Sequence, residues 1–400
     1  RALSAKFDAP PAGVPRTPRQ RGRIRIGYVS ADFRMHSVAV FLYNILKHRD
    51  RDAFEVYCYC STPTQDAMTT KLRLFSDAWR DIRHMPDEEA ARLIARDRID
   101  ILVDLSGHTA GNRLPLFCRR PAPVQCTYLG YPNTTGLKEI DYRITDADAD
   151  PPGLTERLYT EKLVRLPNGF LSYSRHASST PVTVYRHRDP ARHYTFACCN
   201  NIYKVNDDVI DVWGEILRRL PGARLLIKAH NLNNDAIVNR YRRRFDKRGI
   251  GSDQVHLMNT IDNSEHQNLY NHVDIALDPF PYNGTTTTCD ALWMGVPVLT
   301  LAGDRHAARV GASIMRRIGL AGWVAGSETD YVDKAVRYAS DGEYLHRLRL
   351  GMRERLRKSP LMRPRAVVRD LENAYRSWIA DGGAADRRAA GDCAGAPRSG

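Results

Sequence analysis

Four consecutive threonines stand in the segment 283–290, whose sequence is Asn-Gly-Thr-Thr-Thr-Thr-Cys-Asp. The apolar segment 274–280 before it has the character of a buried strand, Asn-Gly breaks that strand, and the threonines open a helical pattern. Backbone N–H groups at a helix start bind anions, and nearby hydroxyls and the helix dipole strengthen that binding. We therefore predict that a diphosphate binds here. The alternative is a threonine-rich helix start without a ligand.

A histidine occupies a second position suited to chemistry. The segment 99–105 has the apolar character of a strand, and Ser-Gly-His-Thr-Ala-Gly follows it at 106–111. Open α/β sheets bind ligands outside the carboxyl ends of their strands, so His108 is a candidate for a catalytic role. A structural histidine, satisfied by hydrogen bonds within the protein, is the alternative.

Alternating strand-like and helix-like segments predict an α/β fold with two parallel sheets. In the first half, the order strand-helix-strand-helix-strand is expected at 23–30, 38–48, 54–60, 87–97 and 99–105, with further strand-like segments at 124–130, 142–146 and 162–167. The alternation starts again at 194, with strands expected at 194–199, 224–229, 254–258, 274–280 and 296–303 and helices at 207–220, 235–248, 264–273 and 307–318.

This pattern divides the chain into five parts. We expect a linker or tail at 1–22, an N-terminal Rossmann-like lobe at 23–180, a C-terminal lobe at 190–362, a last helix at 363–380 and a disordered tail at 381–400. The domain boundary is placed in the polar, weakly patterned stretch 175–190. The last helix is expected to return across the first domain.

The composition is that of an ordinary globular protein of about two domains, with 42% hydrophobic and 26% charged residues in 400. No segment has the roughly 20 consecutive apolar residues that span a bilayer. No signal peptide is recognisable either, so we expect no membrane partner and a cytoplasmic location. Because the chain starts at Arg rather than Met, we expect further residues upstream.

A formal net charge of +14 at pH 7 would suit a nucleic-acid partner. The basic residues are spread over expected helical faces such as 240–248 and 347–358, and no nucleic-acid-binding motif accompanies them. We therefore predict a solvated basic surface and no nucleic-acid partner. Attraction of an anionic donor or of an acidic protein partner is the other interpretation.

Two kinds of motif are absent. The eight cysteines form no CxxC pair, so we expect buried free thiols in a reducing compartment and no metal site or disulfide framework. The first strand is not followed by GxGxxG, and GxxxxGK[ST] does not occur, which argues against a dehydrogenase and against a P-loop nucleotidase.

Several long motifs carry a family resemblance. They lie in order at 27–36 (Gly-Tyr-Val-Ser-Ala-Asp-Phe-x-x-His), 120–136, 203–204 (Tyr-Lys), 278–288 and 295–300. Together they resemble the catalytic region of the O-GlcNAc transferase/SPINDLY family, which is glycosyltransferase family 41. The resemblance extends from about residue 23 to residue 380.

The resemblance implies a GT-B fold, in which two Rossmann-like domains face each other across a cleft, the C-terminal lobe binding the nucleotide-sugar. It implies inverting transfer of a single sugar to Ser or Thr of acceptor proteins, without metal or cofactor, the nucleotide-sugar being the substrate. Family members usually carry tetratricopeptide repeats that bind the acceptor, and we expect such repeats upstream of residue 1.

The resemblance also assigns candidate residues. Lys204 matches the lysine on the donor diphosphate, Thr286 and Thr287 the phosphate-binding threonines, and Asp290 the aspartate that holds the ribose. His266 matches a nucleotide-contacting histidine, and Asn201 stands where O-GlcNAc transferases have glutamine. The alternatives are a surface lysine for Lys204, a first-turn helix acid for Asp290 and a surface residue for His266.

Two histidines are the catalytic candidates besides Lys204. His36 matches the histidine of the first strand-to-helix loop, where an imidazole could accept a proton or only donate a hydrogen bond to the donor. His108 stands where animal O-GlcNAc transferases have tyrosine and where the SPINDLY branch has this Gly-His-Thr sequence. A donor phosphate oxygen is a third candidate for the proton acceptor.

Departures from the family pattern bear on the donor. Thr285 replaces the histidine that O-GlcNAc transferases place before the two phosphate threonines, and the segments 132–137 and 150–153 are closer to SPINDLY. We predict a protein O-glycosyltransferase that uses UDP-GlcNAc, with a GDP-fucose-dependent protein O-fucosyltransferase as the alternative. An alternative of another class is a non-catalytic nucleotide-sugar sensor or partner-binding module.

Overall fold

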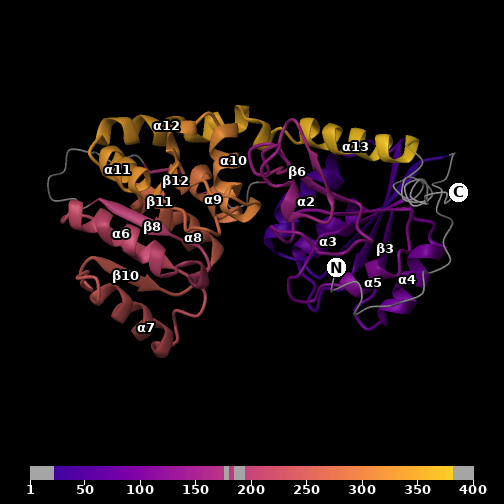
Figure 1. Cartoon of the computed structure of the whole chain (residues 1–400), viewed down its shortest axis with the longest axis horizontal. Helices are drawn as coiled ribbons and strands as arrows, with labels where there is room; N and C mark the ends of the chain where they lie inside the picture. The colour runs from indigo at the N-terminus through magenta and orange to yellow at the C-terminus, as the bar shows by residue number, and fades with distance from the viewer. Residues whose placement is uncertain (1–21, 175–179, 184–193, 382–400) are drawn as a thin grey trace, which may run out of the picture. The chain divides into compact units, whose positions relative to one another are not determined.

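The computed structural model describes residues 22–174, 180–183 and 194–381. Contacts divide them into two compact units, one made of 22–174 with 363–381 and the other of 180–183 with 194–362 (Figure 1). The expected tails at 1–22 and 381–400 lie outside the described residues apart from 22 and 381, as does most of the expected boundary at 175–190. No described helix is long and apolar enough to cross a membrane.

The first unit contains a seven-stranded parallel sheet in the order β3-β2-β1-β4-β5-β6-β7. Its strands are β1 (Ile24–Ser30), β2 (Phe54–Cys60), β3 (Ala78–Asp81), β4 (Ile101–Asp104), β5 (Val124–Thr127), β6 (Tyr142–Thr145) and β7 (Lys162–Arg165). Its α-helices are α2 (Ser37–His48), α3 (Ala67–Leu74), α4 (Asp87–Arg96), α5 (Leu114–Cys118) and α13 (Pro364–Ala380).

The strand order at the start of this unit was predicted incompletely. Helix α3 and strand β3 lie between the second expected strand and the helix expected at 87–97. Helix α3 has only eight residues and a polar sequence, so its apolar period is weak. Strand β3 is a four-residue edge strand with the sequence Ala-Trp-Arg-Asp and no fully buried residue. Its sequence has no strand pattern of its own, and it forms a strand by pairing with β2.

The second unit contains a six-stranded parallel sheet in the order β10-β9-β8-β11-β12-β13. Its strands are β8 (Thr195–Cys198), β9 (Arg224–Lys228), β10 (Val255–Met258), β11 (Ile275–Leu277), β12 (Val298–Leu301) and β13 (Val324–Ala325). Its α-helices are α6 (Asp207–Arg219), α7 (Asp235–Asp246), α8 (Asn263–Leu269), α9 (Thr286–Trp293), α10 (Val310–Arg317), α11 (Glu328–Ala339) and α12 (Gly342–Lys358). The predicted α/β class with two parallel sheets is confirmed.

The order of each sheet reverses next to its first strand. In the first unit the chain runs outward from β1 to β3 and then returns to add β4 on the other side of β1, and in the second unit β8 and β11 are neighbours in the same way. Loops on either side of such a switch point diverge and leave a crevice at the carboxyl edge, where open α/β sheets bind ligands. A ligand-binding site is therefore expected at the loops that follow β1, β4, β8 and β11.

Helix α13 belongs to the first unit, although 188 residues of the other unit (175–362) precede it. It packs against α2 (Figure 1), and its Trp378 ring stacks on Tyr142 with centroids 4.3 Å apart. The hydroxyls of Tyr375 and Tyr28 are 3.3 Å apart, and both tyrosines are buried. The core of the first unit thus includes the end of the described chain.

The described cysteines agree with the sequence prediction. Seven of the eight are described and all seven are free thiols, six of them buried in the two cores. Burial raises the pKa of the Cys58 and Cys198 thiols well above their usual range, so these side chains act as small apolar groups. Cys393 lies outside the described residues.

Candidate active site

The start of helix α9 is built on a buried carboxylate. Asp278, directly after β11, accepts the backbone N–H of Gly284 at 2.6 Å through Oδ1 and the hydroxyl of Thr300 at 2.8 Å through Oδ2. A Cβ on Gly284 would lie 2.6 Å from Oγ1 of Thr287, so glycine leaves room for the threonine hydroxyls at the turn into the helix. The hydrogen bonds of the Asp278 carboxyl group thereby hold the loop between β11 and α9 in place.

Threonine hydroxyls surround this helix start. Oγ1 of Thr287 donates to Oδ1 of Asn200 at 3.1 Å, whereas Oγ1 of Thr286 and Oγ1 of Thr288 are buried without a hydrogen-bond partner among the described residues. Thr285 is the N-cap and makes no side-chain cap bond. The N–H groups of a helix's first turn have no carbonyl partner within the helix. The start of α9 thus presents donors that an anion would satisfy.

Lys204 brings a positive charge to the same place. Its Nζ donates to the carbonyl of Asn283 at 2.8 Å and to Oδ1 of Asn200 at 3.3 Å, and it lies 3.9 Å from the centroid of the Tyr282 ring. Desolvation lowers the pKa of this partly buried lysine, and the charge of Asp278 opposes the shift. The ammonium is therefore held beside the threonines and is weakly hydrated, a state in which an additional anion would be attracted strongly.

A second cluster of polar side chains in this unit consists of Lys228, His266 and Asp290. Nζ of Lys228 lies 2.8 Å from Nδ1 of His266, and Nε2 of His266 lies 4.0 Å from Oδ2 of Asp290. A protonated lysine only donates, so Nδ1 accepts and the ring hydrogen is on Nε2, toward the aspartate. Lys228 is buried and desolvation lowers its pKa. The predicted residues His266 and Asp290 are thus close together.

Lys228 was missed by the sequence analysis, although a signal was present. It is the last residue of β9, in an otherwise apolar strand interior, at the carboxyl edge of the sheet. A lysine is rarely buried unless it is paired, so a lysine at this position of a predicted strand could have been singled out. Its partner on α8 could not be inferred from the sequence, because the two residues are 38 positions apart.

Asn201 has a local structural task. It is the N-cap of the short 3₁₀ helix Ile202–Lys204, and its Oδ1 accepts the N–H of Tyr203 at 3.0 Å. The side chain is exposed. This cap bond orients the turn that carries Lys204, so Asn201 would serve the site even without touching a nucleotide.

His36 lies behind the carboxyl end of β1 and caps α2. Its Nδ1 accepts the N–H of Val38 at 3.3 Å and lies 3.6 Å from Oδ2 of Asp32. Desolvation lowers the pKa of His36, partly opposed by the charge of Asp32, so the ring is neutral at neutral pH. With Nδ1 used as the acceptor, the hydrogen is on Nε2, and the outward edge of this ring is a hydrogen-bond donor.

His108 lies behind the neighbouring strand β4 and has the opposite arrangement. Its Nε2 is 2.8 Å from the carbonyl oxygen of Thr135, and its ring meets the Tyr131 ring edge-on at 5.3 Å. A carbonyl only accepts, so Nε2 carries the hydrogen and Nδ1 of the neutral ring is the basic nitrogen. His108 is exposed. Its geometry therefore fits a proton acceptor better than that of His36 does.

The loop that orients His108 is itself held by buried charges. Gly107 has φ +53°, and a Cβ there would lie 2.3 Å from Cβ of Tyr131, so only glycine fits. Oε1 of the buried Glu161 accepts the N–H of Thr135 at 2.7 Å, and Arg143 donates to the carbonyl of Tyr131 at 2.9 Å. The family-like segment 131–136 is thus a scaffold for the histidine.

The candidate residues form two groups, one in each unit. His36 and His108 follow the adjacent strands β1 and β4 of the first unit. The second unit carries Asn201, Lys204, His266, Thr285, Thr286, Thr287 and Asp290, behind β8, β10 and β11. Among the described residues, no three His, Cys, Asp or Glu side chains gather as metal ligands would.

Two units, each with a parallel sheet and polar residues behind the carboxyl ends of its central strands, make up the architecture found in GT-B glycosyltransferases. The comparisons with known proteins give the family. The sequence model of Glycosyl transferase family 41 matches residues 10–179 and 175–371. The chain therefore belongs to glycosyl transferase family 41.

Among the curated relatives, SPINDLY proteins are more similar to this chain than SEC is. The chain is 42% identical over 360 residues to the tomato (Solanum lycopersicum) "Probable UDP-N-acetylglucosamine--peptide N-acetylglucosaminyltransferase SPINDLY", a match that covers 88% of this chain and 38% of the relative. Identity to the Arabidopsis thaliana protein SEC is 32% over 393 residues, covering 94% and 40%. The chain thus spans well under half the length of these relatives, and the predicted closeness to SPINDLY is confirmed.

Solved structures agree on the fold. An O-GlcNAc transferase mutant of Thermobaculum terrenum superimposes with a TM-score of 0.87 at 40% identity, covering 92% of this chain and 70% of that one. Sucrose-phosphate synthase of Thermosynechococcus elongatus superimposes with a TM-score of 0.56 at 12% identity, covering 90% and 100%. The second similarity concerns the fold alone.

Asp278 makes a testable contribution to stability. Burial raises its pKa to about 7, against about 3.9 for an unfolded aspartate. Between these values the folded chain keeps a proton that the unfolded chain has lost, so this residue makes the free energy of unfolding fall as pH rises from about 4 to about 7. In Asp278→Asn that fall should be absent, as measured by urea unfolding at several pH values.

The control for this experiment is Asp235→Asn, at an exposed aspartate in the first turn of α7. It should keep the pH dependence of the unchanged chain. An unaltered slope in Asp278→Asn would mean that Asp278 is ionised across this range, and the account of the buried carboxyl would be wrong.

Proposed function

We propose that this chain is the catalytic region of a protein O-glycosyltransferase that transfers one sugar from UDP-GlcNAc to Ser or Thr of an acceptor protein. The transfer proceeds with inversion and needs no metal or cofactor. The observation that carries the proposal is the partly buried Lys204 ammonium beside the start of α9, where Oγ1 of Thr286 has no partner among the described residues. A dianionic diphosphate would pair with the ammonium and accept a hydrogen bond from the hydroxyl.

In the proposed reaction, the acceptor hydroxyl attacks the anomeric carbon while the bond from that carbon to the diphosphate oxygen breaks. The electron pair of this bond goes to the diphosphate, which gains negative charge in the transition state. Lys204 and the N–H groups of the first turn of α9 stabilise that charge, and preorganised donors of this kind contribute more in a dry site than in water. Asp290 and His266 hold the nucleoside.

The proton of the acceptor hydroxyl needs a destination. Among the two histidines, His108 is the proposed acceptor, because its Nε2–H is anchored on the carbonyl of Thr135 and Nδ1 remains basic. His36 is proposed to donate a hydrogen bond from Nε2 to the donor sugar or phosphate, because its Nδ1 already caps α2. The donor phosphate is the remaining candidate for the proton.

The nature of the substrates rests on the relatives. The names of the tomato relative and of the Thermobaculum terrenum protein specify N-acetylglucosamine transfer, to a peptide in the first case, and support UDP-GlcNAc as the donor and proteins as acceptors. Tetratricopeptide repeats upstream of this chain are proposed to select the acceptor. The buried free thiols suit the proposed cytoplasmic location.

One observation favours a second donor. Thr285, at the N-cap of α9, stands where the O-GlcNAc transferase branch has histidine, and the chain is closer to SPINDLY than to SEC. GDP-fucose is the donor associated with the SPINDLY branch, so protein O-fucosylation is the second candidate activity. A nucleotide-sugar sensor without catalysis is the candidate of another class. The presence of Lys204 and of two histidines argues against it, because binding of a nucleotide-sugar does not require all three side chains.

The donor can be assigned by calorimetry on the chain as it stands. UDP, UDP-GlcNAc, GDP and GDP-fucose are titrated separately, and we expect the two uridine nucleotides to bind at least about tenfold more tightly, a difference of about 1.4 kcal/mol. A guanosine preference would assign the fucosyl donor instead. If none of the four nucleotides binds, the proposed function is wrong.

Lys204→Ala tests catalysis. Turnover with a radiolabelled donor and an acceptor protein should fall about 10² to 10³-fold, because one preorganised donor to the developing charge is lost. The chain should remain folded, as judged by circular dichroism and thermal unfolding. Lys247→Ala, at an exposed lysine after α7, is the matched control and should turn over normally; normal turnover in Lys204→Ala as well would remove the lysine from the mechanism.

The two histidines are expected to behave differently. His108→Asn should lower kcat about 10² to 10⁴-fold with little change in KM. His36→Gln, which keeps an N–H donor, should mainly raise KM. A turnover of His108→Asn within a few-fold of normal would exclude His108 and favour a donor phosphate oxygen as the proton acceptor.

A further inference from the structure

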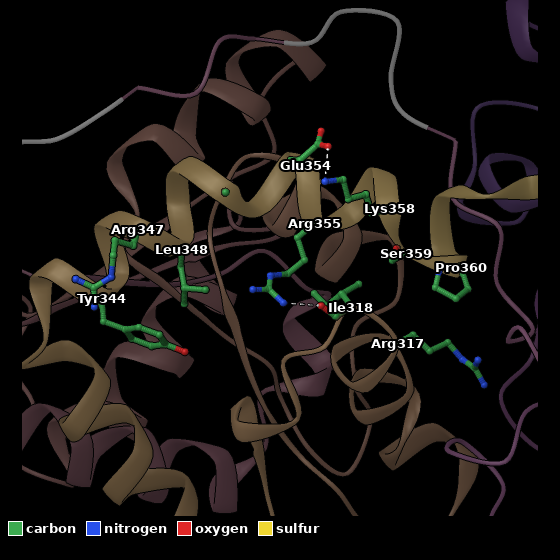
Figure 2. A pocket seen from close by; sticks show the side chains of 11 residues that line it. Arg317, Ile318, Tyr344, Arg347, Leu348, Glu354, Arg355, Lys358, Ser359 and Pro360 are labelled. Atoms are coloured by element: carbon green, nitrogen blue, oxygen red, sulfur yellow. Dashed lines mark hydrogen bonds and ion pairs between the residues drawn. The ribbon is translucent and has the colours of Figure 1, made fainter.

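A hollow of about 610 Å3 opens on the second unit, between α12 and the end of α10 (Figure 2). It lies away from the start of α9 and shares no residue with the candidate active site. The lining residues are Arg317, Ile318, Tyr344, Arg347, Leu348, Gly351, Glu354, Arg355, Lys358, Ser359 and Pro360. A volume of this size is typical of a ligand-binding pocket.

One face of α12 forms most of the wall. Tyr344, Leu348, Gly351, Arg355 and Lys358 follow one another at three- and four-residue spacing, so they lie along a single stripe of the helix. Leu348 and Ile318 are buried and provide an apolar floor. Figure 2 shows the Arg355 side chain reaching across the hollow to Ile318, whose carbonyl it contacts at 3.2 Å.

The rim of the hollow is strongly basic. Four of the lining residues are cations and one, Glu354, is an anion. Lys358 lies 3.2 Å from Glu354 and Arg347 lies 3.8 Å from Glu343, but these side chains are between 58% and 75% exposed. Exposed pairs of this kind contribute little and are easily exchanged, so an anion in the hollow meets a positive field.

Gly351 is the least expected residue of this wall. It lies in the middle of α12, where glycine is the poorest helix former after proline. Its φ is not positive, and a Cβ added there would meet no atom within 4 Å. Neither the backbone nor the packing therefore requires glycine. Because glycine has no side chain, the hollow stays open at this position.

We propose that this hollow docks an acidic peptide segment of a partner protein. An aliphatic side chain of the peptide fills the space above Gly351, against Leu348 and Ile318, and flanking carboxylates pair with Arg347 and Lys358. The concave shape favours a peptide over a membrane, because a flat anionic surface would reach the rim but not the apolar floor. This inference does not depend on the proposed glycosyl transfer.

The probe is a fluorescein-labelled hexapeptide of Asp and Glu around a single Leu, and fluorescence anisotropy measures its binding to the whole chain. Binding should weaken with added salt, because the contacts are between charges near the surface. The same peptide with Asn and Gln in place of its acids should not bind. Vesicles of phosphatidylcholine with phosphatidylserine are tested in parallel.

The decisive variants are Gly351→Ala and Gly351→Leu. Both should leave the fold intact and raise the thermal stability, because alanine and leucine are better helix formers than glycine. Peptide binding should weaken in the order of side-chain volume, with Leu at least about tenfold weaker than the unchanged chain, because the leucine occupies the place of the peptide side chain. Undiminished binding in Gly351→Leu would overturn the proposal.

Charge is tested separately. Arg347→Glu with Lys358→Glu should weaken peptide binding about tenfold or more, because each reversed charge replaces an attraction to the peptide by a repulsion. Arg242→Glu with Arg243→Glu, on exposed positions of α7, changes the net charge equally and should have no effect. Equal loss in both double variants would mean that net charge alone attracts the peptide, and vesicle binding without peptide binding would assign the rim to a membrane; either result overturns the proposal.

Discussion

The buried carboxylate of Asp278 is the interaction on which the second unit depends most. It joins the loop before α9 to strand β12, through the N–H of Gly284 and the hydroxyl of Thr300, while its own carbonyl accepts the hydroxyl of Tyr331 on α11 at 3.2 Å. It also faces the ammonium of Lys204, whose pKa it supports. Burying an acid is costly unless it is hydrogen-bonded, and here each hydrogen bond fixes a part of the site.

The first unit contains a buried aspartate with the same kind of hydrogen bonds. Asp104, the last residue of β4, is buried and accepts the N–H of Gly107 at 2.9 Å and the hydroxyl of Thr127 on β5 at 2.8 Å. Desolvation raises the pKa of Asp104, as it does that of Asp278. In both units an aspartate at the switch point thus ties a glycine turn to a threonine of the next strand, and the functional side chain follows the turn.

The sequence predicted most of the elements and site residues whose signal lies in neighbours along the chain, although the amphipathic helix α11 was not predicted. The strand-like segments, the threonines at a helix start and the loops behind β1 and β4 all lie where the local pattern indicates. Helix α3 and strand β3 were missed because their residues carry little pattern of their own; the helix packs against α2 and the strand pairs with β2. Lys228 was missed, and the two different tautomers of His36 and His108 could not be inferred, because each depends on a partner supplied from elsewhere in the fold.

The discontinuous first unit has a consequence for biosynthesis. Tyr28 meets Tyr375 across 347 positions of sequence, so the core beneath β1 is incomplete until the last helix has left the ribosome. The second unit is continuous in sequence and carries its own sheet and core. It can therefore fold before α13 is available to complete the core of the first unit. The first unit can therefore close only after α13 has been synthesised, and a chain interrupted before residue 364 would expose the apolar face that α13 covers.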